Sequence, residues 1–340
     1  MKKTDRAHSE QASKKLRRYL FLGIMLVFAF ALVYEGINGA GPLSKSTAVI
    51  VPKGADLNSI SRKLKDEGVI GSEFLFSFGA RLKQVHRELR AGEYRFPPGI
   101  SIRDVLSVMR EGQHINRRVT IAEGLNVRQV LEVLDRTKGL DGQISPLPEE
   151  GTLLPDTYYF VFGATRQSIV DQMRSQMNDL LEKSWTNRAA SLPIKTKQEL
   201  IILASIVEKE TGLAAERRQI AGVFINRLRL GMRLESDPTV MYAVTGGKRK
   251  LARGLKKSEL RREHPYNTYR VHGLPPGPIC NPGRESIAAV LNPERTSALF
   301  FVADGTGGHI FSDTLKEHLK AVRKWRKIER TLKRRTTQAN

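Results

Sequence analysis

The sequence contains one cysteine, Cys280, among 340 residues. A single thiol can form neither an intrachain disulfide nor a zinc site built from several thiolates. The seven histidines show no helical pairing and no neighbouring cysteine or carboxylate cluster. We therefore predict no metal site and no cofactor. The length allows two or three domains, each with a hydrophobic core of its own.

Acidic residues are also scarce. The chain has 35 Asp and Glu against 57 Lys and Arg, which gives a formal net charge of +22. Residues 1–18 contribute +5 of this excess and residues 316–340 contribute +8. A basic chain suits an anionic polymer, an anionic lipid surface or nucleic acid, and charge alone does not choose among them.

The longest apolar run lies near the N-terminus. Residues 19–34 carry no charge, follow four basic residues and continue to Ile37 around Glu35. Because about 20 residues cross a bilayer, we predict a transmembrane anchor over residues 19–37. The tripeptide at 29–31 is also compatible with signal-peptide cleavage. We favour an uncleaved anchor because the apolar run continues past it.

The charge distribution around this anchor predicts its orientation. By the positive-inside rule, the basic tail over residues 1–18 stays in the cytoplasm, and everything after about residue 38 lies outside. We therefore predict a single-pass protein of the inner (plasma) membrane that contacts its lipid, with the bulk of the chain in the periplasm or its equivalent. This topology argues against nucleic acid as a partner. The small, turn-forming residues at 38–46 indicate a short linker.

A unit repeated three times follows the linker. Its copies align on Gly54, Gly99 and Gly124 without a gap, and each has a β-prone start, a turn at the glycine and a helix. A residue type that caps helices stands two positions after each glycine, and apolar residues at offsets three, six and ten form one helix face. The capping residues are Asp56, Ser101 and Asn126. We predict that the three units pack on one another over residues 47–140.

The three copies resemble LysM-like modules, a family that binds the N-acetylglucosamine chains of cell walls. This resemblance implies that residues 47–140 grip glycan. The alternative is a set of βα units that only pack on each other.

The stretch ELIILASIVEKETG, residues 199–212, combines an apolar helix with carboxylates at its end. Thr196 and Glu199 form a capping box that predicts the helix start. Eight residues, apolar apart from Ser205, stand directly before Glu208. We expect burial to raise the pKa of Glu208, as a general acid requires. Glu210 lies about 200° further around the helix, so it cannot share the face of Glu208, and we expect one of the two to act in a site and the other to make a structural contact.

Further motifs follow in a fixed order along the chain. They are LLPDTYYF at 153–160, VFINRLRLGMRLESDPTVMY at 223–242, YNTY at 266–269, GLPPGPICNPG at 273–283 and FVADGTGGHIFS at 301–312. Together with LASIVEKETG at 203–212, they resemble the YceG-like family of endolytic murein transglycosylases. The resemblance implies an α+β protein with a mixed α/β catalytic domain over residues 141–315. A basic C-terminal helix over residues 316–340 completes the predicted organisation.

The resemblance also implies a reaction and the residues that perform it. Members of the family cleave the β-1,4 bond from N-acetylmuramic acid to N-acetylglucosamine within nascent peptidoglycan strands, leave 1,6-anhydro ends and work beside peptidoglycan synthases (penicillin-binding proteins). The first glutamate of the V-E-K-E-T motif is Glu208, which the resemblance makes the sole acid and base.

We predict a substrate site around this acid. Its members are Tyr266, Asn267, Thr268, Tyr269, Asp237, Thr239 and Glu210. The competing hypothesis is a non-catalytic peptidoglycan-binding scaffold in which Glu208 forms a structural ion pair with one of Arg217, Arg218 and Arg227.

Overall fold

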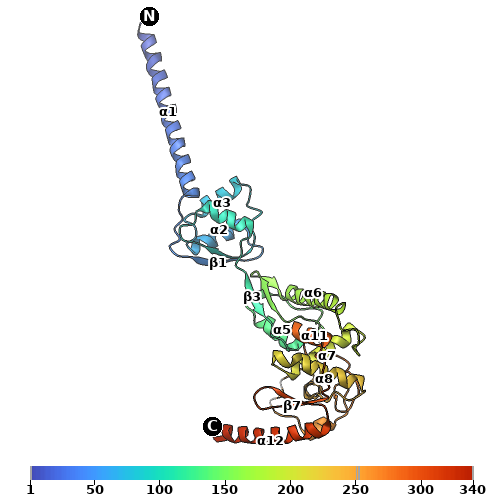
Figure 1. Ribbon diagram of the computed structural model, residues 1–340. Coiled ribbons are helices and arrows are strands. Elements are labelled where there is room, and N and C mark those ends of the chain that lie inside the picture. The colour runs from blue at the N-terminus through green and yellow to red at the C-terminus, as the bar shows by residue number, and fades with distance from the viewer. Residues whose placement is uncertain (1, 250, 252, 339–340) are drawn as a thin grey trace. The chain divides into compact units, whose positions relative to one another are not determined.

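The computed structural model describes residues 2–249, 251 and 253–338, and the chain divides into two compact units. Unit 1 comprises Met1–Arg117 and Phe160–Gly163, and unit 2 comprises Arg118–Tyr159 and Ala164–Asn340. Helices and strands occur in both units, which confirms the predicted mixture of α and β structure (Figure 1).

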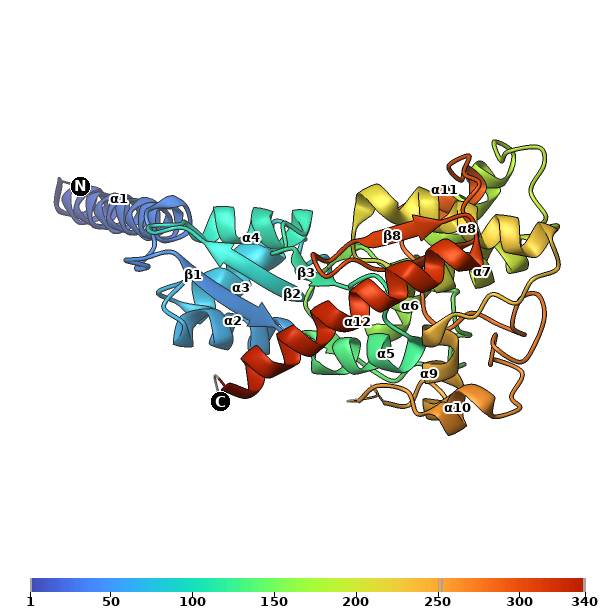
Figure 2. The ribbon, with the colours of Figure 1, turned by 60° about the horizontal axis from the view of Figure 1, so that its bottom comes forward.

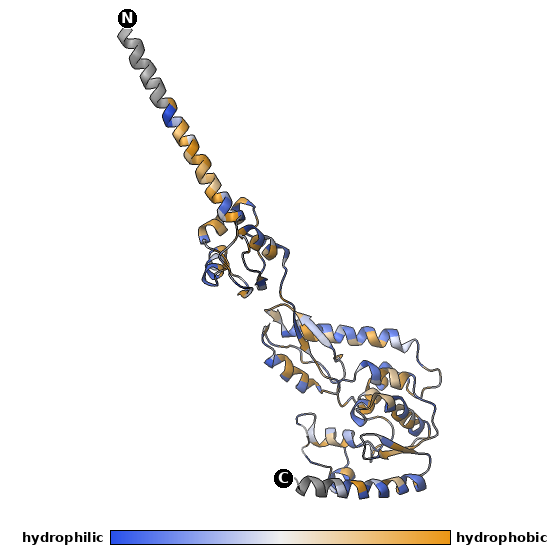
Figure 3. Cartoon of the chain, turned by 60° about the vertical axis from the view of Figure 1, so that its left-hand side comes forward, coloured by the Kyte–Doolittle hydropathy of each residue, from blue (hydrophilic) through white to orange (hydrophobic). Residues whose placement is uncertain are grey.

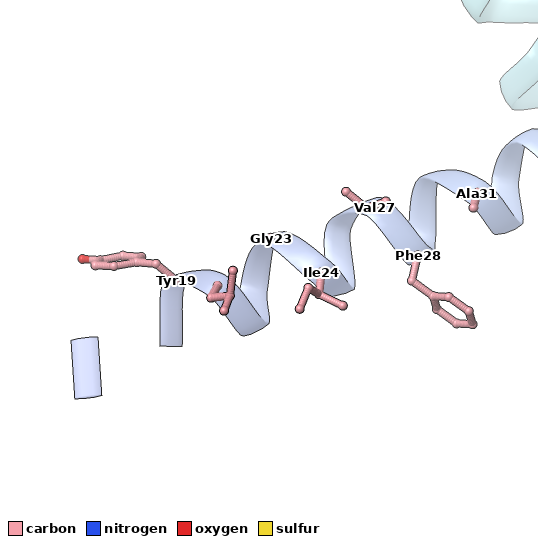
Figure 4. A pocket seen from close by; sticks show the side chains of 7 residues that line it. Tyr19, Gly23, Ile24, Val27, Phe28 and Ala31 are labelled. Atoms are coloured by element: carbon pink, nitrogen blue, oxygen red, sulfur yellow. The ribbon is translucent and has the colours of Figure 1, made fainter. Parts of the chain in front are cut away.

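The N-terminal helix α1 (Lys2–Asn38) is long and apolar enough over Leu16–Asn38 to cross a membrane. Figure 3 shows the middle of this stretch in the colours of hydrophobic residues, with hydrophilic turns towards both ends. Gly23 carries no side chain, so a shallow apolar groove runs between its neighbours (Figure 4). Such a helix is compatible with a single-pass membrane anchor.

The segment predicted as a linker packs on unit 1. The Gly41 amide donates to the Gly99 carbonyl at 3.2 Å, and the Gly99 amide donates to the Leu43 carbonyl at 2.8 Å. Leu43 and Ile37 are buried in the core of this unit. The end of α1 is therefore part of the folded unit and is not separated from it by a free linker.

Unit 1 is built from the first two repeat copies. Its strands β1 (Thr47–Val51) and β2 (Gly92–Phe96) pair antiparallel, with Val49 opposite Tyr94. The apolar faces of its helices join the buried strand residues in one core. These helices are α2 (Leu57–Asp66), α3 (Glu73–Leu82) and α4 (Ile102–Glu111).

The predicted turns are present in all three copies. The three repeat glycines adopt left-handed backbone conformations with φ of 78°, 67° and 74°, which glycine adopts without steric cost. Each predicted capping side chain accepts a hydrogen bond from the backbone amide three residues later. The local part of the repeat prediction is therefore confirmed.

The third copy departs from the prediction that all three pack together. From residue 118 onward it belongs to unit 2. Its strand β3 (Arg117–Thr120) pairs with β5 (Thr157–Phe160), and its helix α5 (Val127–Arg136) follows the turn. Backbone bonds link Gly124 and Leu125 to Asn281, so this turn is a wall of unit 2.

Unit 2 consists mainly of helices that surround α7 (Lys197–Glu210). Helices α8 (Arg217–Arg229) and α11 (Arg284–Leu291) pack directly on it. Figure 2 shows α12 (Leu315–Gln338) along the hairpin of β7 (Phe300–Ala303) and β8 (His309–Ser312), on which it packs. The remaining elements are β4 (Leu140–Asp141), β6 (Ala164–Thr165), α6 (Arg166–Trp185), α9 (Asp237–Thr245) and α10 (Lys257–Arg261). A 3-10 turn covers Ala214–Glu216.

Helix α7 is buried over its central eight residues. The capping box of Thr196 and Glu199 is formed, and every residue from 200 to 207 is buried. The one polar side chain in this run, Ser205, donates to the Ile202 carbonyl at 2.7 Å and accepts from the Ile279 amide at 3.0 Å. The sequence prediction of a buried helix is therefore confirmed, and Ser205 connects it to the proline-rich loop.

We expect Ser205→Ala to lower the free energy of unfolding by about 1–3 kcal/mol, because it leaves the buried Ile279 amide without an acceptor. Thermal or urea unfolding followed by tryptophan fluorescence measures this, since Trp185 and Trp325 both lie in unit 2. The exposed Ser258→Ala is the matched control. Equal stability of the two variants would show that this bond contributes nothing.

Candidate active site

Two carboxylates leave the last turn of α7 in different directions. Glu208 Oε2 accepts from the Gly283 amide at 3.0 Å and from Ser286 Oγ at 2.7 Å, where α11 begins. Glu210 Oε1 accepts from Ser236 Oγ at 2.5 Å, just before α9. The prediction that the two glutamates face different neighbours is confirmed.

Glu208 is half-buried, as Glu210 is, although the eight residues before Glu208 are buried. Its surroundings include a second carboxylate, Glu123. A Cβ at Gly283 would collide with Glu123, so this side chain lies directly against Gly283. Burial, together with the nearby charge of Glu208, raises the pKa of Glu123. Arg217, one of the three cations considered as partners for Glu208, lies 4.0 Å from Glu123 and pairs with it.

Glu210 is the second carboxylate in the last turn of α7. Burial of its carboxyl group raises the pKa of Glu210 to about 7. The hydrogen bond from Ser236 opposes this rise, the nearby Asp237 adds to it, and Arg227 opposes it. A carboxyl group that keeps its proton up to neutral pH is suited to general acid catalysis.

Two cavities meet at Glu210. The first, called the Tyr242 cavity, holds about 640 Å³ and is lined by the third repeat turn (123–126), Glu210 and residues of α9 that include Met241 and Tyr242. The second, called the Arg227 cavity, holds about 540 Å³ and lies between Glu210, Arg227 and helix α12. Glu208 lines neither of them.

Three of the predicted substrate residues lie near these cavities. Asp237 and Tyr269 line the Arg227 cavity, and the Tyr269 hydroxyl donates to Asp237 Oδ1 at 2.7 Å. The ring of Tyr266 lies 4.9 Å from the ring of Tyr242. Aromatic rings beside carboxylates are typical of ligand sites with a few placed polar groups.

The other three predicted substrate residues are enclosed by the protein. Asn267 is 1 % exposed, and its amide donates to the carbonyls of Glu259, Leu260 and Arg262. Thr268 and Thr239 are fully buried, with their hydroxyl groups 2.8 Å apart. The Thr268 hydroxyl accepts from the Ser236 amide at 2.9 Å, and the Thr239 hydroxyl donates to the Ser236 carbonyl at 2.7 Å. The structure therefore does not support direct sugar contacts for these three.

Comparison with known proteins agrees with this architecture. The sequence model of the YceG-like family matches residues 49–324. The chain belongs to the YceG-like family. An endolytic murein transglycosylase of Bacillus subtilis is 34% identical over 316 residues, which cover 83% of this chain and 86% of that protein.

Two further relatives extend the comparison. An endolytic murein transglycosylase of Streptococcus pneumoniae is 27% identical over 333 residues, which cover 84% of this chain and 59% of that longer protein. A crystal structure of a YceG-like protein from Listeria monocytogenes superposes with a TM-score of 0.50 at 30% identity. That match covers 82% of this chain and 99% of the Listeria chain.

In this YceG-like chain, two residues that the sequence did not single out hold the wall of the Tyr242 cavity. The side chain of Asn281 donates to the Leu125 carbonyl and accepts from the Leu153 amide, each at 3.0 Å. Glu150 accepts from the Val127 amide at 2.9 Å. These partners are far apart in sequence, so no local pattern could have revealed them.

Among the residues that the structure describes, no three His, Cys, Asp or Glu side chains form a group able to hold a metal ion.

We expect Glu150 to make stability depend on pH. Burial raises the pKa of Glu150 from 4.5 to about 7. The folded state therefore binds more protons than the unfolded state between these values, and stability falls as the pH rises through this range. Glu150→Gln should reduce the fall in melting temperature from about pH 5 to about pH 8. Its exposed neighbour Glu149→Gln is the control. Parallel pH dependence in both variants would contradict this role.

Proposed function

We propose that this chain is a membrane-anchored endolytic murein transglycosylase. It cleaves the β-1,4 bond between N-acetylmuramic acid and N-acetylglucosamine within peptidoglycan strands and leaves 1,6-anhydro ends. Membership of the YceG-like family and the activity named for its relatives support this function. The observation that carries it is the carboxyl of Glu210, with a pKa of about 7, placed where two cavities meet.

Glu210 takes the acid and base role that the sequence assigned to Glu208. Its position on both cavities favours it, and burial, opposed by the hydrogen bond from Ser236, raises its pKa to about 7. Glu208 is instead bonded to the first residues of α11. We assign to Glu208 the positioning of α7 against α11, which fixes the direction of the last helical turn and hence of Glu210.

One carboxyl group is sufficient for this reaction. Ordinary glycosidases use two carboxylates, one of which activates water or forms a covalent intermediate. Here Glu210 donates its proton to the glycosidic oxygen as the bond from C1 to that oxygen breaks. The 6-hydroxyl of the same muramic acid attacks C1, and the Glu210 carboxylate accepts the hydroxyl proton. The products are a 1,6-anhydro end and a new 4-hydroxyl end, and no water is consumed.

The two cavities provide room for sugars on both sides of the cleaved bond. Their volumes of about 640 and 540 Å³ lie in the range of small-molecule sites. In the Arg227 cavity, Tyr269 and Asp237 offer an aromatic edge and a hydrogen-bond acceptor. In the Tyr242 cavity, Tyr242 offers a ring that Tyr266 supports from behind.

Helix α1 and unit 1 determine where this site meets its substrate. Helix α1 crosses the inner membrane with the basic N-terminus in the cytoplasm, following the positive-inside rule, so unit 2 works outside beside the peptidoglycan synthases. The LysM-like copies of unit 1 hold the glycan strand. The competing function is a scaffold that binds peptidoglycan without cutting it, and the first experiment below separates the two.

Glu210→Gln should abolish the release of 1,6-anhydro ends from purified sacculi, with a loss of at least about 10²–10⁴-fold, because the amide cannot donate the proton. Glu208→Gln is the matched variant two residues away. It should keep measurable activity, because it alters only the contact with α11. Mass spectrometry of the released muropeptides measures both.

Three other outcomes of this experiment would contradict the proposal. Full activity of Glu210→Gln beside an inactive Glu208→Gln would return the catalytic role to Glu208. An inactive parent chain that still binds sacculi would favour the scaffold. Products with reducing ends would indicate a hydrolase.

We expect kcat/KM to fall above about pH 7, because Glu210 must carry its proton to act as the acid. Ser236→Ala removes a hydrogen bond that favours the carboxylate, so it should move this basic limb to higher pH. Asp237→Asn removes a like charge, so it should move the limb to lower pH. Rate profiles across pH measure both shifts. A limb that neither substitution moves would mean that another group supplies the proton.

A further inference from the structure

Helix α3 of unit 1 carries a row of apolar side chains on its exposed face. Phe74, Phe78 and Leu82 follow one another at intervals of four residues and are 72%, 41% and 68% exposed. This spacing puts all three on one side of the helix. The rings of Phe74 and Phe78 stack with their centroids 6.1 Å apart. Because the opposite face buries Phe76 and Ala80 in the core, this row, called the α3 ridge, is not needed for the packing of unit 1.

The α3 ridge lies beside the end of the apolar helix α1. Helix α3 packs against α1, and its Leu75 lies directly over Gly36. The next residue of α1, Ile37, is buried in the core of unit 1. Figure 1 shows α3 on the side of unit 1 where α1 enters. The ridge is therefore continuous with the surface from which the membrane-crossing helix emerges.

The length of the uncharged stretch of α1 determines how close the bilayer lies to unit 1. The uncharged stretch between Arg18 and Glu35 contains 16 residues, which is about 24 Å of helix at roughly 1.5 Å per residue. The hydrocarbon core of a bilayer is about 30 Å thick. Since the stretch is shorter than that, the headgroup region lies close to the residues of α1 that pack on unit 1.

The basic residues beside the α3 ridge also fit a position at the membrane surface. Arg81, Lys83 and Arg87 are exposed at its C-terminal end, and such residues are attracted to anionic lipid headgroups. A helix with phenylalanine and leucine on one face and basic residues beside them is typical of helices that lie in the membrane interface.

We propose that the α3 ridge inserts into the bilayer beside α1 and seats unit 1 on the membrane surface. The occupant of this apolar face is lipid. The inference rests on the proposed crossing of the membrane by α1, and it is independent of the chemistry of Glu210. It gives the chain a second membrane contact, which restricts how unit 1 can tilt about its anchor.

Depth-dependent fluorescence quenching tests this contact in the full chain. The protein is reconstituted in vesicles of phosphatidylcholine and phosphatidylglycerol that include a lipid spin-labelled either near its headgroup or, in a parallel preparation, deep in its acyl chain. A polarity-sensitive fluorophore is attached to Phe78→Cys or, independently, to Leu82→Cys. The native Cys280 is 1 % exposed and stays unlabelled. The controls are Leu26→Cys within α1, 71% exposed, and Leu230→Cys in unit 2, 63% exposed.

We expect the headgroup label to quench the probes at positions 78 and 82 several-fold more than the probe at 230, and the acyl-chain label to quench the probe at 26. If position 26 is quenched while 78 and 82 behave like 230, the anchor stands and the α3 ridge does not touch lipid. If position 26 is not quenched either, α1 does not cross the bilayer and the inference fails with it. Energy transfer between position-78 probes on different chains, without quenching by lipid, would assign the ridge to a second copy of the chain and overturn the proposal.

Discussion

The removal of water from one carboxyl group is the constraint on which the account of unit 2 depends. Helix α7 is buried over residues 200–207 because other helices pack on it, and a helix enclosed in this way delivers its last turn to a fixed place. Glu210 stands in that last turn, and burial raises its pKa to about 7. The cost of ionising a desolvated carboxyl is what keeps a proton available for a glycosidic oxygen. Ser205, Glu208 and Asn281 form hydrogen bonds that fix the segments packed around that turn.

The sequence predicted the features that depend on near neighbours. The capping box at Thr196, the buried run of α7 and the left-handed turns at the three repeat glycines are all present. Each of these depends on residues within a few positions of one another, so local spacing is sufficient to reveal it. The family membership was predicted for a related reason, since several long motifs in a fixed order rarely occur together by chance.

The sequence did not reveal features that depend on distant partners. Local spacing did not reveal that Glu208 accepts two hydrogen bonds from the start of α11, or that burial raises the pKa of Glu210 to about 7. The side chain of Asn267 looked available for a sugar, but three carbonyls of a neighbouring segment occupy its amide. The third repeat copy looked like its two predecessors, but long-range pairing of β3 with β5 places it in unit 2. In each case the deciding contact joins segments that local spacing does not connect.

The central claim is that the Glu210 carboxyl keeps its proton up to neutral pH. Carbon-13 labelling of glutamate side chains gives a nuclear magnetic resonance titration of each carboxyl in the full chain, and the signal missing from Glu210→Gln identifies this group. The account predicts a midpoint close to pH 7 for that signal. A midpoint near the ordinary glutamate value of 4.5 would contradict it.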